Sequence, residues 1–285
     1  MRPTGPGLRR ALRSGKLLIG GAVVAVLLGA ATVGPSLAPA DWAELDRVGG
    51  AHQGPSWKHP LGTDATQRDV LLGVIAGSRL SLAAGLISMT LALAVGVPVG
   101  VWAGFRGGWF DAAAMRSIDI FLALPSVLIA MLMVMALSPG WGPVVVSVAL
   151  INVPLFARQI RATVLTIRHQ DYVLASRALG STDLGIMVRV LLPATVQPII
   201  VLATLGLGNA ILEVAALSFL GFGGDADSPE WGAMLARARG HLALTRWPAI
   251  GPGLAISLTV LGLNLLGDGL RDWLDPQSRR DALGR

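Results

Sequence analysis

The chain alternates between long apolar runs and shorter polar segments. A helix needs about 20 predominantly apolar residues to cross the roughly 30 Å hydrocarbon core of a bilayer. Runs of this kind occupy residues 17–38, 80–103, 120–137, 140–157, 194–222 and 249–266. This pattern predicts an all-α polytopic membrane protein with about six transmembrane helices.

The first run also has the outline of a cleavable signal peptide. Basic residues precede it, and it ends in Ser36-Leu37-Ala38, which is a plausible cleavage site. The run is longer than the usual apolar core of about 7–15 residues in a signal peptide. We therefore expect a retained transmembrane helix over residues 17–39.

Basic residues between the runs orient the chain, because cytoplasmic loops carry an excess of Lys and Arg. Residues 1–16 hold five basic residues and no acid, and residues 158–189 hold five arginines against two aspartates. Both segments are expected in the cytoplasm, as are both termini. The predicted order is a basic cytoplasmic arm (1–16), the first transmembrane helix (17–39), an outside segment (40–79), a five-helix core (80–270) and a cytoplasmic tail (271–285). The core contains a cytoplasmic loop (158–193) and an outside loop (223–248).

Composition narrows the class further. The 285 residues are 53% hydrophobic and 14% charged, whereas soluble domains are about 25% charged. The net charge is +6, but the basic residues lie between apolar runs and do not form a basic patch on a solvated fold. We therefore expect membrane lipid, and no nucleic acid, as a partner. The chain has no Cys, which excludes disulfides, thiolate metal sites and a Cys nucleophile.

The loop 158–193 is too long for a simple turn. Its sequence predicts a helix over 171–179 that ends at Gly180, a residue suited to a left-handed cap. Ser181 or Thr182 then caps a second helix over 183–191, which stops before Pro193. Such an elbow presents a knob to the cytoplasm. An amphipathic hairpin lying on lipid headgroups fits the same pattern equally well.

The elbow resembles the signature loop of ABC importer permeases. That loop has Glu-Ala-Ala, three residues, Gly, nine residues, Ile, one residue and Leu-Pro. The matching positions here are Ala175, Gly180, Val190 and Leu192-Pro193. Two positions depart from the pattern, since Leu174 replaces the usual Glu and Ser176 replaces the second Ala.

The resemblance implies that the elbow docks on a separate ATP-hydrolysing subunit. The replacement of Glu by Leu174 would remove one polar contact of that docking. The candidate coupling residues are Asp171, Leu174, Ala175, Ser176, Arg177, Gly180, Asp183, Leu192 and Pro193.

Three other stretches resemble the dipeptide/oligopeptide/nickel family of these permeases. They are residues 59–64 with 68–71, residues 215–223 with 231–235, and residues 263–272 with 274–276. The likeness covers roughly residues 10–280 and points to the second of the two permeases in dipeptide and oligopeptide systems, the DppC/OppC type. It implies a type I ABC importer permease fold in the bacterial inner membrane, where segments 40–79 and 223–248 would be periplasmic.

The same resemblance implies import of short peptides or a related small solute. The implied partners are a second permease, two ATP-binding subunits and an extracytoplasmic substrate-binding protein. The chain lacks a phosphate-binding loop, G-x-x-x-x-G-K-[ST], because its only Gly-Lys pair, Gly15-Lys16, is followed by Leu17. We therefore expect no cofactor in this chain, no catalytic residues, and ATP with Mg²⁺ on the partner subunits.

Glu213 is the one carboxylate deep in an apolar run, and Asn209 lies one turn before it. Ionisable groups within a membrane usually face protein or a water-filled interior. Both side chains are candidates for the translocation path or its seam with the partner permease. The alternative is a structural hydrogen bond to a neighbouring helix.

Three smaller patterns give further expectations. Gly96, Gly100 and Gly104 favour close packing of the second span within the subunit over a dimer seam. Arg116 and Asp119 are expected to pair with each other. No metal site is expected from the four histidines, and an exposed capped turn explains His59, Asp64 and Asp69.

Other classes need features that the sequence does not offer. A secondary transporter would need charges in several spans and often an inverted repeat. An intramembrane enzyme would need a nucleophile–base or metal pair. A membrane scaffold stays open on composition alone.

Overall fold

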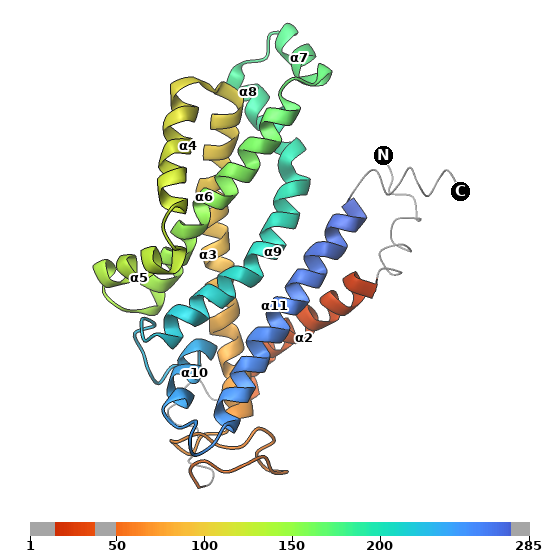
Figure 1. The fold of residues 1–285 in the computed structure, drawn as a ribbon. Coiled ribbons are helices and arrows are strands. Elements are labelled where there is room, and N and C mark those ends of the chain that lie inside the picture. Colours follow the sequence, from red (N-terminus) through yellow and green to blue (C-terminus); the bar gives the residue numbers. More distant parts are fainter. Residues whose placement is uncertain (1–14, 38–49, 275–285) are drawn as a thin grey trace.

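The computed structural model describes residues 15–37 and 50–274, and this part of the chain is helical with one isolated β-bridge (Figure 1). Most of the predicted arm and tail therefore lies outside the described residues. The helices are α2 (Gly15–Leu37), α3 (Val70–Arg106), α4 (Gly108–Leu122), α5 (Ser126–Leu137), α6 (Trp141–Ile167), α7 (Asp171–Ala178), α8 (Asp183–Ile186), the π-helix η2 (Met187–Leu191), α9 (Leu192–Phe219), α10 (Trp231–Arg239) and α11 (Trp247–Leu274).

Within the described ranges, five helical segments are long and apolar enough to cross a membrane: α2, α3, α6, α8 to α9, and α11. The pair α4 and α5 counts as a sixth span if it is taken together, although the two helices meet at 93°. This confirms the predicted all-α fold with about six spans.

The third predicted span is not one straight helix. The apolar run 120–137 is broken at residues 123–125, between the end of α4 and the start of α5. Pro125 has φ −57° and ψ 123°, outside the helical region. Proline lacks the N–H needed for the helical ladder and disfavours helical backbone in the residue before it. The apolar pattern does not predict this break, because hydropathy depends on residue composition and not on the direction of the helix axis.

Helix α3 is much longer than its apolar run suggests. It has 37 residues, hence a length of about 55 Å against a hydrocarbon core of about 30 Å. Asp69 caps its first turn by accepting a hydrogen bond from the Leu72 N–H at 3.0 Å. The helix ends at Gly107, whose φ of +65° favours glycine.

Close packing of α3 on α6 forms the centre of the molecule. A Cβ at Gly96 would lie 2.9 Å from the Phe156 Cβ, and one at Gly100 would lie 2.6 Å from the Ala157 carbonyl oxygen. The glycines therefore let the two backbones approach, as small residues do in membrane helices. This confirms the expectation that the stripe packs within the subunit.

Helix α2 packs at the side of this core, against α11. A Cβ at Gly20 would lie 2.7 Å from the Gly262 carbonyl oxygen, so the two backbones are in contact there. The Lys16 ammonium pairs with Asp272 at 3.2 Å near the ends of the two helices. This packing supports a retained helix over a signal peptide.

The two ends of the molecule carry different elements (Figure 1). The elbow helices α7 and α8 lie at one end, beside the last turns of α3 and α6. Residues 50–69, α10 and the start of α11 lie at the other end. The predicted cytoplasmic loop 158–193 and the predicted outside loop 223–248 are therefore on opposite sides.

Candidate functional site: the elbow and the intramembrane pair

The turn between α7 and α8 is built around Gly180. Its φ of +85° lies in the left-handed region, where other residues are strained. The Gly180 N–H donates to the Arg177 carbonyl at 3.0 Å, and the Ser181 N–H donates to the Ser176 carbonyl at 3.1 Å. The Thr182 hydroxyl then accepts from the Gly185 N–H at 3.2 Å and caps α8. The predicted cap is therefore Thr182.

The second arm of the elbow does not stop before Pro193, so that expectation is wrong. Helix α8 has four residues and continues through η2 into α9, which has Pro193 in its first turn. Proline normally blocks a helix because it removes an i→i−4 hydrogen bond and clashes with the preceding turn. Here the π-helix η2 directly precedes Pro193, and the Leu192 N–H donates to the Met187 carbonyl five residues back.

Apolar contacts fix the elbow to the ends of the spans. Val173 of α7 is 1% exposed and Ile186 of α8 is 0% exposed. Both belong to one buried cluster with Phe105 of α3 and with Ile160 and Val164 of α6. The elbow is thus packed against two long helices at its base.

The outer surface of the elbow is exposed and apolar. Leu179 at its tip is 87% exposed and Leu184 is 63% exposed, while Tyr172 and Leu174 are each half exposed. Exposed apolar side chains gathered on one knob are typical of an interaction surface.

The predicted coupling residues divide into three groups in the structure. Asp171, Leu174 and Ala175 are exposed on α7, and Leu192 and Pro193 are exposed at the start of α9. Ser176 and Gly180 shape the turn, where the Ser176 and Ser181 hydroxyls lie 3.0 Å apart. Arg177 and Asp183 lie 3.9 Å apart across the elbow.

Inside the membrane region, Glu213 of α9 has a partner on α6. The Asn152 amide donates to its carboxylate at 2.7 Å and to the Val148 carbonyl at 2.9 Å. Asn152 is 6% exposed, Glu213 is half-buried and Asn209 is exposed. The hydrogen bond to a neighbouring helix is therefore present, and Asn209 takes no part in it. The sequence feature that could have indicated Asn152 as a partner is its position as a polar amide inside the fourth apolar run.

Ion pairs hold α4 against α6. The Arg161 guanidinium makes two hydrogen bonds to Asp111, at 2.5 and 2.6 Å, and Arg158 pairs with Asp119. The expected Arg116–Asp119 pair is wrong, because α6 presents Arg158 to the same carboxylate. Spacing along one helix cannot reveal a partner on another.

At the opposite end, Glu230 anchors α10 between the spans. It is 2% exposed and accepts hydrogen bonds from the Gly232 and Ala233 N–H groups, each at 2.9 Å. Burial raises the pKa of its carboxyl, against the opposing effect of these bonds and those from Ser218 and Ser81. The neighbouring Trp231 is fully buried and donates from its indole N–H to the Val74 carbonyl at 3.0 Å.

The segment before α3 is less exposed than expected. Asp64 does form the capped turn, accepting from the Thr66 and Arg68 N–H groups at 2.8 and 2.9 Å. His59 and Asp69, however, are 8% and 4% exposed and lie 2.8 Å apart. They are a buried structural pair, because Asp69 must sit under the turn to cap α3. Within the described ranges, no group of three or more His, Cys, Asp or Glu is placed to hold a metal.

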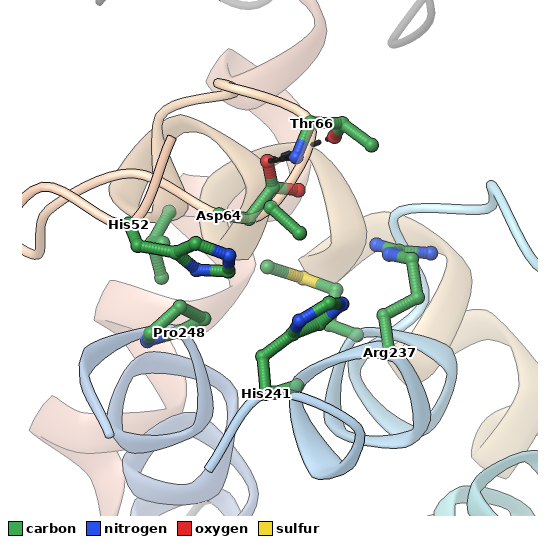
Figure 2. Close-up of a pocket in the computed structure, with 10 residues that line it drawn as sticks. His52, Asp64, Thr66, Arg237, His241 and Pro248 are labelled. Carbon is green, nitrogen blue, oxygen red and sulfur yellow. Dashed lines mark hydrogen bonds between the residues drawn. The ribbon is translucent and has the colours of Figure 1, made fainter. Parts of the chain in front are cut away.

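A small cavity lies at this end between residues 52–70, α10 and α11 (Figure 2). The rings of His52 and His241 line it and lie next to each other, with centroids 4.9 Å apart and planes tilted by 45°. Arg237 donates to the Ser228 carbonyl at 2.9 Å, and burial lowers the pKa of its guanidinium. The cavity volume is about 160 Å³. Ligand pockets for small molecules usually measure about 300–1,000 Å³, so this cavity is too small for a peptide.

The fold is that of a polytopic membrane protein with one broken span and an exposed, partly apolar elbow at one end. Residues 96–280 match a family described as binding-protein-dependent transport system inner membrane component. The chain belongs to this family. The predictions of an ABC importer permease, a non-catalytic subunit and a multi-pass inner-membrane location are therefore confirmed.

Named relatives are similar over nearly the whole chain. It is 40% identical to the dipeptide transport system permease protein DppC of Alkalihalophilus pseudofirmus over 269 residues, 94% of this chain and 88% of that protein. It is also 40% identical to the glutathione transport system permease protein GsiD of Pectobacterium atrosepticum over 272 residues, covering 94% and 89%.

A solved structure of the same fold is the MetNI methionine ABC transporter in an inward-facing conformation. The TM-score is 0.56 at 21% identity, covering 71% of this chain and 96% of that chain. At this identity the likeness shows the fold.

Proposed function

We propose that this permease passes short peptides, including small thiol peptides of the glutathione type, inward across the membrane. The dipeptide and glutathione transport named for the two relatives supports this solute class. We also propose that it works beside a second permease, with two ATP-binding subunits and an extracytoplasmic binding protein. ATP and Mg²⁺ would bind those ATPase subunits.

The exposed elbow is the observation that carries the proposal. Its apolar tip, Leu179 and Leu184, suits a groove on the ATPase subunit. A hairpin lying on lipid headgroups would suit the same side chains. However, α3 is about 25 Å longer than the hydrocarbon core, and the elbow packs on its last turn. This arrangement supports an elbow held beyond the lipid surface.

A reconstituted complex tests the function directly. The tagged chain, expressed with the genes that neighbour it, should co-purify with two ATPase chains and one other permease. In proteoliposomes with ATP inside and loaded binding protein outside, labelled dipeptide or glutathione should be transported. A complex that hydrolyses ATP but accumulates neither solute would refute the peptide assignment. Uptake driven by an ion gradient without ATP would favour a secondary transporter.

We propose further that Glu213 and Asn209 face the translocation path or its seam with the second permease. Asn209 is exposed in the isolated chain and lies one turn from Glu213 on α9. The Asn152 hydrogen bond fixes one side of the Glu213 carboxylate and leaves its other oxygen for a solute or a partner.

A further inference from the structure

Three consecutive residues in the last turn of α3 are each contacted by a residue of the loop that follows α6. The Gly104 carbonyl accepts from the Arg168 guanidinium at 2.9 Å, the Arg177 guanidinium lies 5.4 Å above the Phe105 ring, and Arg106 lies 3.9 Å from Asp183. The loop therefore contacts a backbone carbonyl, an aromatic ring and a charged side chain of α3, all within its last turn.

These contacts differ in strength. The ion pair of Arg106 with Asp183 joins side chains that are 58% and 50% exposed, so water screens it and it contributes little. Phe105 is 8% exposed and lies in one buried cluster with Val173 and Ile186 of the elbow. The stronger contacts are thus the Arg168 hydrogen bond and the apolar cluster. The Arg177–Phe105 cation–π contact adds a smaller share, because its ring is buried but the Arg177 side chain is 58% exposed.

The last turn of α3 leads directly into α4, a helix with few buried side chains. Gly107 and Gly108 follow it, both with positive φ, and α4 begins there. Of the fifteen residues that the structure describes in α4, Ile118 is the one that is buried. A displacement of the α3 end would therefore pass into α4 against few buried side chains, and the ion pairs of Asp111 and Asp119 are the links that tie α4 to α6.

We propose that Arg168, Arg177 and Phe105 form a clamp that makes the elbow and the last turn of α3 move as one unit. These are positioning residues: they carry a displacement of the elbow into α3 and the α3–α4 turn. The inference rests on the proposed docking of the elbow to an ATPase subunit, and it adds the intramolecular half of that coupling.

Phe105→Leu and Arg177→Met test the clamp in the full complex. Leu keeps an apolar side chain at Phe105 but removes the ring face, and Met keeps the length of Arg177 without its charge. Both complexes should assemble, and Phe105→Leu should keep its basal ATP hydrolysis, while uptake and its stimulation by loaded binding protein fall about 2- to 5-fold in both variants. The double variant should fall no further than the worse single variant, because both remove one contact. Arg189→Met, at an exposed arginine of η2, is the matched control and should transport normally.

Two outcomes overturn the clamp. One is normal uptake and normal stimulation in both single variants. The other is loss of the ATPase chains from the Arg177→Met complex while Phe105→Leu transports normally, which would assign Arg177 to the ATPase interface. Failure of the proposed function itself looks different, since the wild-type complex would then lack ATPase chains or ATP-dependent uptake.

A distance measurement tests the rigid unit without relying on activity. The sequence has no Cys, so spin labels can be placed at chosen pairs without background. Labels on Gln170→Cys, which is exposed and bonded to the first turn of α7, and on Trp102→Cys report on the elbow and the end of α3, and Gln170→Cys with Arg271→Cys spans to α11. On ATP addition to the full complex, the first distance should stay constant while the second changes. A first distance that changes as much as the second overturns the inference.

Discussion

At the scale of single residues, two substitutions separate a structural role of Glu213 from a role in transport. Glu213→Gln keeps an oxygen that accepts the Asn152 hydrogen bond but removes the charge, so folding should be unchanged and uptake should fall if the carboxylate faces the path. Asn152→Ala leaves the carboxylate unpaired and should cost about 1–3 kcal/mol. Thermal unfolding in detergent and uptake in proteoliposomes give the two readouts. Wild-type uptake by Glu213→Gln removes this residue from the path.

The buried carboxyl of Glu230 predicts a pH-dependent stability. Its folded-state pKa is raised above the unfolded value, mainly by burial, so the folded state holds the proton more tightly. Stability is then greatest below the ordinary pKa of about 4.3 and is lost as pH rises through the raised value. Melting temperatures measured as pH rises above about 4.3 should fall with pH in the wild type and be flatter in Glu230→Gln. Asp227→Asn is the control, because the Asp227 side chain is 67% exposed. An equal slope in wild type and Glu230→Gln would contradict this assignment.

The sequence predicts the role of a residue where that role depends on its neighbours along the chain, and not where it depends on another helix. Gly180 and the cap at 181–182 depend on neighbouring backbone, so their roles can be inferred from residue type. The partners of Asp119 and Glu213 come from another helix. Spacing along one chain segment carries no information about such partners.

At the scale of elements, the elbow depends on one left-handed residue. Gly180→Pro cannot adopt the observed φ of +85° and loses the N–H that closes the turn. Uptake and substrate-stimulated ATPase activity should both be lost, with membrane insertion intact. Gly180→Ala, where a Cβ meets nothing within 4 Å, should show a milder loss from strain of about 1–2 kcal/mol. Wild-type uptake and stimulation in Gly180→Pro would refute the coupling role.

The contact of α3 with α6 makes a second prediction about elements. A side chain at Gly100 meets the backbone of Ala157, which cannot move aside as a flexible side chain can. Gly100→Val should therefore destabilise the protein by about 1–3 kcal/mol or more. Gly21→Ala is the control, because its Cβ meets nothing within 4 Å. Fluorescence-detected size exclusion after heating compares the two, and equal survival would argue against close packing.

Apolar runs located the spans because crossing a membrane is a matter of composition and length. They missed the break before Pro125 and the helix that continues through Pro193. Both outcomes depend on backbone geometry around a proline, and the same residue type ends one helix and is tolerated in the first turn of another.

At the scale of the whole molecule, the orientation remains a prediction that labelling can decide. Trp57 is fully exposed at the end that carries α10, and Leu179 is 87% exposed at the elbow. Because the chain has no Cys, Trp57→Cys and Leu179→Cys each provide a single reactive site. An impermeant maleimide should label Trp57→Cys in cells with a permeabilised outer membrane, and Leu179→Cys only in inverted vesicles. The positive segment 158–189 predicts this direction, since basic loops stay in the cytoplasm. The reverse pattern would place the elbow on the wrong side for ATP and would refute its proposed docking to an ATPase.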